Sequence, residues 1–434
     1  MEFNELSPII FIPGLMGSIG GEMLGCQIEW GFGVASWFYK PFIKELEKLG
    51  YEINKNLFIC YYDWRKSCRE IVKEFLQPLI SQVEKIYPNQ KIDLLCHSMG
   101  GVVARTYIQK TEYPYNIRNL MCFGTPNKGN IEAYYLWSIG KLMKRTNKEK
   151  DLFEIIRRGY IWILTKMLDL PLGRENIEKL HSSFEGLGDL IPTEDYGEIL
   201  CYKTDNDYIY IPRRYTIYNN NLLNDLNNNI NILNNRVENL YCFVGTKNET
   251  DKALILDKES LFKYKKGYII GSLKTMQGDG TVTLNSATID NAKTFVIEGS
   301  HSGILKDSIK YIADIYNLDK SLMDTNIEEL KEYPLGIIFK KRIDIELKNE
   351  INIIGRFIDG EFITEYDCIC QEFGKDYLWI MFKNIPIGNY ILEAFTKYQE
   401  DNNIFIIGSL IEEELSKTDL QNSSINTIKF SFKV

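Results

Sequence analysis

KIDLLCHSMGG, residues 91–101, gives the strongest indication of the fold. Residues 91–96, KIDLLC, form a short apolar run that is typical of a buried strand, and residues 99–110, MGGVVARTYIQK, fit a helix. Ser98 lies between them, with Cys96 two residues before it and Gly100 two residues after it. Small residues at these places are typical of a nucleophile elbow, in which a sharp strand-to-helix turn exposes a serine hydroxyl. The alternative is a serine in an ordinary strand–helix turn.

Composition limits the class of protein. A chain of 434 residues can form two domains and a large core. Its 44% hydrophobic and 25% charged residues are ordinary values for a soluble globular protein. The net charge of -8 argues against a nucleic-acid binder and against simple attraction to anionic lipid.

Cysteine usage and the start of the chain bear on the compartment. The nine cysteines are odd in number and form no CxxC pair, which favours reduced thiols. Residues 1–14, MEFNELSPIIFIPG, lack the basic n-region and cleavage site of a signal peptide. No apolar run approaches the ~20 residues of a membrane span. We therefore expect a cytoplasmic protein without a transmembrane segment, a metal cluster or a cofactor; the oligomeric state stays open.

Strands alternate with helices through much of the chain. Strands are predicted at residues 8–12, 57–64, 91–96, 117–123, 240–244 and 294–298, and helices at 37–49, 66–87 and about 305–316. This alternation predicts an α/β fold, with a mostly parallel sheet covered by helices on both faces. Ligands bind such sheets at the carboxyl ends of the strands, where Leu15, Asp63, Ser98 and Thr125 are expected.

Two regions depart from this pattern. Residues 127–238 predict a helical cap inserted into a core of residues 1–126 and 239–320, and residues 219–235 predict one helix inside it. Residues 254–272 predict an inserted hairpin. The apolar cluster at residues 160–168 is either a lipid-facing surface, with Trp162 as a substrate contact, or the cap's own core.

The C-terminal region has a different texture. After a linker at residues 321–333, short β runs separated by Gly, Asn and Asp turns fill residues 334–434. This spacing predicts a β-sandwich-like module. Its ligand is a glycan, a lipid or a protein, or it is a packing appendage without a ligand.

A serine nucleophile needs a base, and the chain has three histidines. His97 adjoins Ser98 and should point away from its hydroxyl, and His181 lies in the predicted cap. His301 follows the last predicted strand at a glycine-flanked turn, which makes it the expected base. The acid that orients it is Asp279, between two glycines, or one of Glu249 and Asp251, which directly follow a strand.

The turn at residues 13–18, PGLMGS, follows the first strand. It can supply one oxyanion N–H at Leu15, with the second from Met99, the residue after the serine. The alternative is a plain strand-end turn. Asp63 and Arg65 either bind a substrate head group or form a structural ion pair.

Six segments in order carry a resemblance to a known family. Over residues 8–315 the chain resembles the lecithin–cholesterol acyltransferase family of α/β-hydrolase lipases, phospholipases and acyltransferases. The segments that carry the resemblance are FIPGLMGS, YDWR, HSMGG, GTPNKG, GDGTV and a final histidine. The resemblance implies an α/β-hydrolase fold, favours Asp279 as the acid, and implies that the cap holds an acyl chain. The departures are Cys96 in place of the elbow's first glycine and the lack of a disulfide framework.

Together these features predict a serine acyl hydrolase or O-acyltransferase that acts on lipid esters without a cofactor. Ser98, Asp279 and His301 follow the chain order of α/β hydrolases. Two alternatives remain. The chain can be an esterase, thioesterase or amidase for a small acyl substrate, or a catalytically idle binding protein led by its β-module.

Overall fold

The structure divides the chain into two compact units. It is a computed structural model that describes residues 6–24, 29–143, 150–167, 177–259, 268–321, 323, 332–396, 403–415 and 427–434. The first unit comprises Met1–Ser18, Phe38–Met143 and Leu172–Thr325, and the second comprises Ile19–Trp37, Lys144–Pro171 and Asn326–Val434. Most of the predicted linker at residues 321–333 lies outside the described residues.

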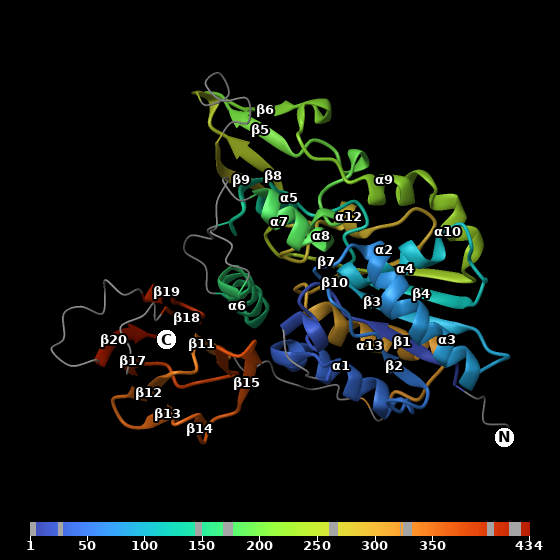
Figure 1. The fold of residues 1–434 in the computed structure, drawn as a ribbon. Helices are drawn as coiled ribbons and strands as arrows, with labels where there is room; N and C mark the ends of the chain where they lie inside the picture. The colour runs from blue at the N-terminus through green and yellow to red at the C-terminus, as the bar shows by residue number, and fades with distance from the viewer. Residues whose placement is uncertain are drawn as a thin grey trace. The chain divides into compact units, whose positions relative to one another are not determined.

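A six-stranded sheet forms the centre of the first unit (Figure 1). Its strands are β1 (Ile9–Ile12), β2 (Leu57–Ile59), β3 (Ile92–His97), β4 (Ile117–Phe123), β7 (Asn239–Thr246) and β10 (Lys293–Glu298). They lie in the order β10-β7-β4-β3-β1-β2, and every neighbouring pair is parallel. β1 and β3 are buried along their whole length, because both faces of a parallel sheet are covered. The predicted α/β sheet is thus confirmed.

Helices connect these strands. They are α1 (Ser36–Lys48), α2 (Cys68–Ile71), a π-helical turn (Val72–Leu76), α3 (Gln77–Ile86), α4 (Met99–Ile108), α12 (Leu284–Ala287) and α13 (Gly303–Tyr316). The single helix predicted at residues 66–87 contains the π-helical turn just before Pro78. Proline has no N–H to donate, so it is tolerated in the first turn of α3. A capping box between Ser67 and Glu70 starts α2.

The segment predicted as a cap contains both helices and strands. Its helices in the first unit are α5 (Ile131–Ile139), α7 (Ile177–Ser183), α8 (Glu185–Gly188), α9 (Asn221–Asn228) and α10 (Ile230–Arg236). Strands β5 (Leu200–Lys203) and β6 (Tyr208–Ile211) join β8 (Thr250–Leu256) and β9 (Ile269–Thr275) in a sheet of order β6-β5-β8-β9. The antiparallel β8–β9 pair occupies the predicted hairpin. The helix expected at residues 219–235 is two helices, because Asn229 leaves helical geometry between them.

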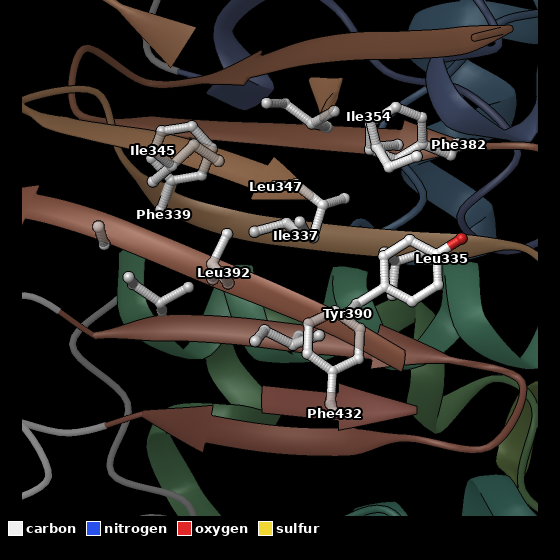
Figure 2. Packing of buried hydrophobic residues seen from close by; sticks show 14 of the residues in the cluster. Leu335, Ile337, Phe339, Ile345, Leu347, Ile354, Phe382, Tyr390, Leu392 and Phe432 are labelled. Atoms are coloured by element: carbon white, nitrogen blue, oxygen red, sulfur yellow. The ribbon is translucent and has the colours of Figure 1, made fainter. Parts of the chain in front are cut away.

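Two antiparallel five-stranded sheets build the C-terminal part of the second unit. One, in the order β15-β16-β11-β18-β19, contains β11 (Leu335–Lys340), β15 (Cys368–Phe373), β16 (Tyr377–Phe382), β18 (Ile404–Gly408) and β19 (Glu412–Leu415). The other, in the order β14-β13-β12-β17-β20, contains β12 (Ile343–Asn349), β13 (Ile353–Ile358), β14 (Glu361–Ile363), β17 (Asn389–Thr396) and β20 (Thr427–Lys433). Figure 2 shows side chains of both sheets packed into one core. The predicted β-sandwich-like module is confirmed.

Helix α6 (Leu152–Met167) belongs to this second unit and packs on β11 and β18. The Trp162 ring stacks on Phe405 with 5.1 Å between centroids, and the Tyr160 ring meets Trp379 edge-on at 5.3 Å. A Cβ at Gly159 would lie 2.3 Å from the Trp379 ring, so helix and sheet approach closely here. These contacts favour packing over lipid contact for the apolar cluster at residues 160–167, although the partner is the β-module rather than a cap core. Leu168 lies outside the described residues.

Candidate functional site

Ser98 lies at the sharp turn between β3 and α4. Its backbone has φ 53° and ψ −123°, a strained conformation for a residue with a side chain. The turn also brings α4 against the end of β1: a Cβ at Gly100 would lie 2.3 Å from the carbonyl oxygen of Ile12. Glycine is therefore required two residues after the serine, as the elbow pattern predicts.

One histidine side chain connects Ser98 to a carboxylate. His301 Nε2 is 2.9 Å from Ser98 Oγ, and His301 Nδ1 is 2.8 Å from Asp279 Oδ2. The other carboxylate oxygen of Asp279 accepts hydrogen bonds from the backbone N–H groups of Thr281 and Val282 at 2.9 and 2.7 Å. Asp279 is 1% exposed, His301 2% and Ser98 9%, so water reaches the serine more readily than the other two.

The acids that competed with Asp279 in the sequence make other bonds. Glu249 forms an ion pair with Lys274 at 2.5 Å, and Asp251 accepts a hydrogen bond from Ser272 at 2.6 Å. The sequence offered three carboxylates as partners of His301. Among them, the structure describes a hydrogen bond to the His301 ring for Asp279.

The third histidine also has another environment. His181, in the last turn of α7, stacks on Trp137 with 3.7 Å between ring centroids. Its Nε2 lies 2.9 Å from the Trp137 carbonyl oxygen. This packing within the inserted segment supports a structural role for His181.

Glycines leave room for the histidine and the aspartate at the ends of neighbouring strands. Gly124, after β4, has φ +57°, and a Cβ there would lie 3.1 Å from both Asp279 Oδ2 and the His301 ring. A Cβ at Gly245 in β7 would lie 2.4 Å from the Cβ of Asp279. A side chain at either place would displace the pair.

The turn after β1 approaches Ser98 from another side. The Gly14 N–H donates to the Tyr39 hydroxyl at 2.8 Å, and the Gly17 N–H donates to the Gly14 carbonyl at 3.0 Å. These two N–H groups are thus engaged within the protein, and the oxyanion role expected of Leu15 stays a prediction. Met99 is the first residue of α4, so its N–H has no acceptor within the helix.

Two side chains near the serine, Tyr39 and His97, form hydrogen bonds that the sequence did not predict. The Tyr39 hydroxyl is 2.9 Å from His97 Nδ1, and His97 Nε2 is 2.9 Å from the backbone carbonyl oxygen of His301. His97 thus points away from the Ser98 hydroxyl, as its place in β3 implied. Burial, followed by the nearby His301 ring, lowers the pKa of His97 from 6.5 to about 3. The sequence showed that His97 adjoins Ser98, but it did not show that His97 contacts Tyr39 on α1.

Asp63 and Arg65 form an ion pair with each other. Arg65 Nε donates to Asp63 Oδ1 at 2.9 Å and Arg65 Nη2 donates to Oδ2 at 2.7 Å. The Arg65 backbone N–H also donates to Oδ1, at 3.1 Å. This geometry favours the structural ion pair over a head-group contact. Trp162, the third tentative substrate contact, is 6% exposed and lies in the second unit.

Comparison with known proteins gives one match to a family model. Residues 26–151 match the family model of Lecithin:cholesterol acyltransferase. The resemblance carried by the sequence motifs is thus confirmed, and it indicates an enzyme of the lipase and acyltransferase kind. A search of curated proteins found no match in sequence.

A search of solved structures found weak similarity to a lipase and a phospholipase, among others. The propeptide form of Bacillus licheniformis lipase BlEst2 is 10% identical, with a TM-score of 0.36, and the alignment covers 99% of this chain and 96% of that one. Phospholipase PlaB from Legionella pneumophila is 12% identical, with a TM-score of 0.35 and coverage of 94% and 91%. The parallel strand order and the strand–turn–helix around Ser98 define an α/β-hydrolase fold.

Proposed function

We propose that this chain is a serine acyl hydrolase or O-acyltransferase that acts on lipid esters through an acyl-enzyme at Ser98. The observation that carries the proposal is the His301 ring, which lies 2.9 Å from Ser98 Oγ and 2.8 Å from Asp279 Oδ2. Three side chains that are far apart in sequence meet in the geometry that acyl transfer requires.

The mechanism follows from these positions. Ser98 Oγ attacks the ester carbonyl carbon while His301 Nε2 takes the hydroxyl proton. Asp279 accepts the Nδ1–H bond and stabilises the imidazolium that forms. The N–H groups of Leu15 and Met99 hold the oxyanion. His301 then gives its proton to the leaving alcohol, and water or a second alcohol, activated by the same ring, releases the acyl group from Ser98.

The substrate class rests on the family match at residues 26–151, which favours a lipid ester over a small acyl substrate. In the part of the chain that the structure describes, no helix is both long and apolar enough to cross a membrane. The eight described cysteines are free thiols, which supports a reducing compartment such as the cytoplasm.

Covalent labelling and substrate profiling test the proposal. A fluorophosphonate should label the wild-type chain at Ser98, found by peptide mass spectrometry, and Ser98→Ala should neither label nor turn over p-nitrophenyl esters. An unlabelled wild-type chain would favour the idle binding protein. Turnover of a lipid panel, with products identified by mass spectrometry, should rise with acyl-chain length. A flat profile would favour the small-ester, thioesterase or amidase alternative.

A further inference from the structure

Three segments that are separate in sequence meet at the candidate site. They are the turn after β1 with Gly14, the elbow with Ser98, and the loop after β10 with His301. Acyl transfer tolerates little error in their relative positions, because a misplacement of about 1 Å can cost ~100-fold in rate. Contacts that hold these segments in register therefore matter for the rate.

A buried chain of hydrogen bonds joins all three. The Gly14 N–H donates to the Tyr39 hydroxyl at 2.8 Å, and this hydroxyl lies 2.9 Å from His97 Nδ1. His97 Nε2 lies 2.9 Å from the His301 carbonyl oxygen. Tyr39 is 1% exposed and His97 is fully buried. Because His97 precedes Ser98 directly, this chain of hydrogen bonds passes through the elbow.

The direction of each bond follows from the chemistry of its atoms. A carbonyl oxygen only accepts, so His97 Nε2 must carry a proton. In the neutral ring Nδ1 is then an acceptor, and the Tyr39 hydroxyl donates to it. This hydroxyl in turn accepts from Gly14. The low pKa of His97, about 3, agrees with a ring that stays neutral.

The His301 backbone is held from both sides. Its N–H donates to the Asp279 carbonyl at 2.9 Å, and its carbonyl accepts from His97. The His301 ring then reaches Ser98 and Asp279 from a fixed backbone. The position of the base therefore depends on His97, although His97 does not touch the reacting atoms.

We propose that Tyr39 and His97 are positioning residues, whose hydrogen-bond chain holds the oxyanion turn at Gly14 and the His301 loop in register with Ser98. This inference rests on the proposed acyl transfer at Ser98. Tyr39 and His97 act through Gly14 and His301, so their loss slows the chemical step and leaves substrate binding nearly unchanged.

The test first establishes ester turnover and Ser98 labelling in the wild-type protein, and their absence would contradict the proposed function itself. Active sites are then counted by fluorophosphonate titration in Tyr39→Phe, His97→Asn and His97→Gln. Rates are expressed per titrated site, which separates slower chemistry from a smaller folded fraction. Tyr107→Phe is the matched control, because it removes a buried hydroxyl that pairs with Asn116 instead.

We expect kcat per site to fall at least about tenfold in Tyr39→Phe and His97→Asn, with KM within about threefold of wild type. The longer side chain in His97→Gln can bring its amide N–H close to the position of His97 Nε2 and still donate to the His301 carbonyl, whereas the amide in His97→Asn is one methylene shorter. His97→Gln should therefore keep more activity than His97→Asn. The double variant Tyr39→Phe/His97→Asn should lose no more activity than the worse single variant, because either single change already breaks the same series of hydrogen bonds. Tyr107→Phe should match wild type.

Three outcomes would overturn the inference. The first is a kcat per site in both Tyr39→Phe and His97→Asn within about twofold of wild type. The second is a loss of titratable sites at an unchanged rate per site, since that is the signature of a purely structural role. The third is losses that multiply in the double variant, which would mean that the two side chains act independently.

Discussion

Gly14 lies so close to Ser98 that a Cβ at position 14 would be only 2.7 Å from the Cβ of Ser98. Real Cβ atoms do not approach one another this closely, so any side chain here would push the turn after β1 away from the elbow. In the mechanism that we propose, this closeness of the two backbones lets a neighbouring N–H reach the oxyanion of a substrate bound to Ser98.

Gly14→Ala should therefore lower kcat for ester turnover by about 100-fold, roughly the effect of losing one oxyanion donor. The thermal midpoint should change much less, because the turn can shift without exposing the core. Gly388→Ala is the matched control, since a Cβ there meets nothing within 4 Å. Near-normal turnover in Gly14→Ala would contradict the placement of this turn in the site.

Asp279→Asn should lower kcat by about 1,000- to 10,000-fold, because an amide can favour the wrong tautomer of the His301 ring. Glu249→Gln should stay within about twofold of wild type, since its carboxylate pairs with Lys274. Both variants are compared on the same p-nitrophenyl ester. Equal, mild effects would remove Asp279 from the site.

Trp162→Ala should lower the free energy of unfolding of the second unit by about 3–5 kcal/mol, because it removes a buried ring stacked on Phe405. Chain-length preference in ester turnover should not change. Urea denaturation and kcat/KM on short and long esters measure the two effects. Ile351→Ala, at an 86% exposed side chain, is the control. A shift toward short esters at unchanged stability would instead mean that Trp162 contacts lipid.

Stability should fall with acid because of His97. Its pKa is about 3 in the folded protein and near 6.5 when unfolded, so between these values the unfolded chain binds a proton that the folded chain does not. The contribution is complete above pH 6.5 and is lost as the pH falls toward 3, at up to about 1.4 kcal/mol per pH unit.

His97→Gln cannot bind this proton in either state. Its stability should therefore change less than that of the wild type between pH 7.5 and pH 5, by about 2 kcal/mol. Urea denaturation at a series of pH values measures the difference between the two slopes. Parallel slopes would mean that folding does not lower the pKa of His97.

Features that depend on neighbours in sequence could be predicted well. The apolar run before Ser98, the glycines after it and the order Ser98, Asp279, His301 indicated the sheet, the elbow and the three side chains that the structure brings together. Strands β5 and β6 were missed, because they are only four residues each and β6 is largely exposed, so neither carries a strong periodic pattern.

Features that depend on distant pairing could not be predicted. The partner of α6 is one, because an apolar helix has the same pattern whether it faces lipid, a cap or a sheet. The Tyr39–His97 contact is another, because the pattern of an amphipathic helix does not indicate which residue the hydroxyl of its tyrosine will contact.

The packing of α6 on β11 and β18 also sets an order for biosynthesis. A ribosome releases α6 long before it makes the strands that cover Tyr160 and Trp162. Until then the helix must emerge with its aromatic face exposed, which is the kind of surface that chaperones recognise and that aggregates. A chain truncated before β11 would retain this exposed face permanently, so removing the β-module should yield an insoluble protein rather than a smaller enzyme.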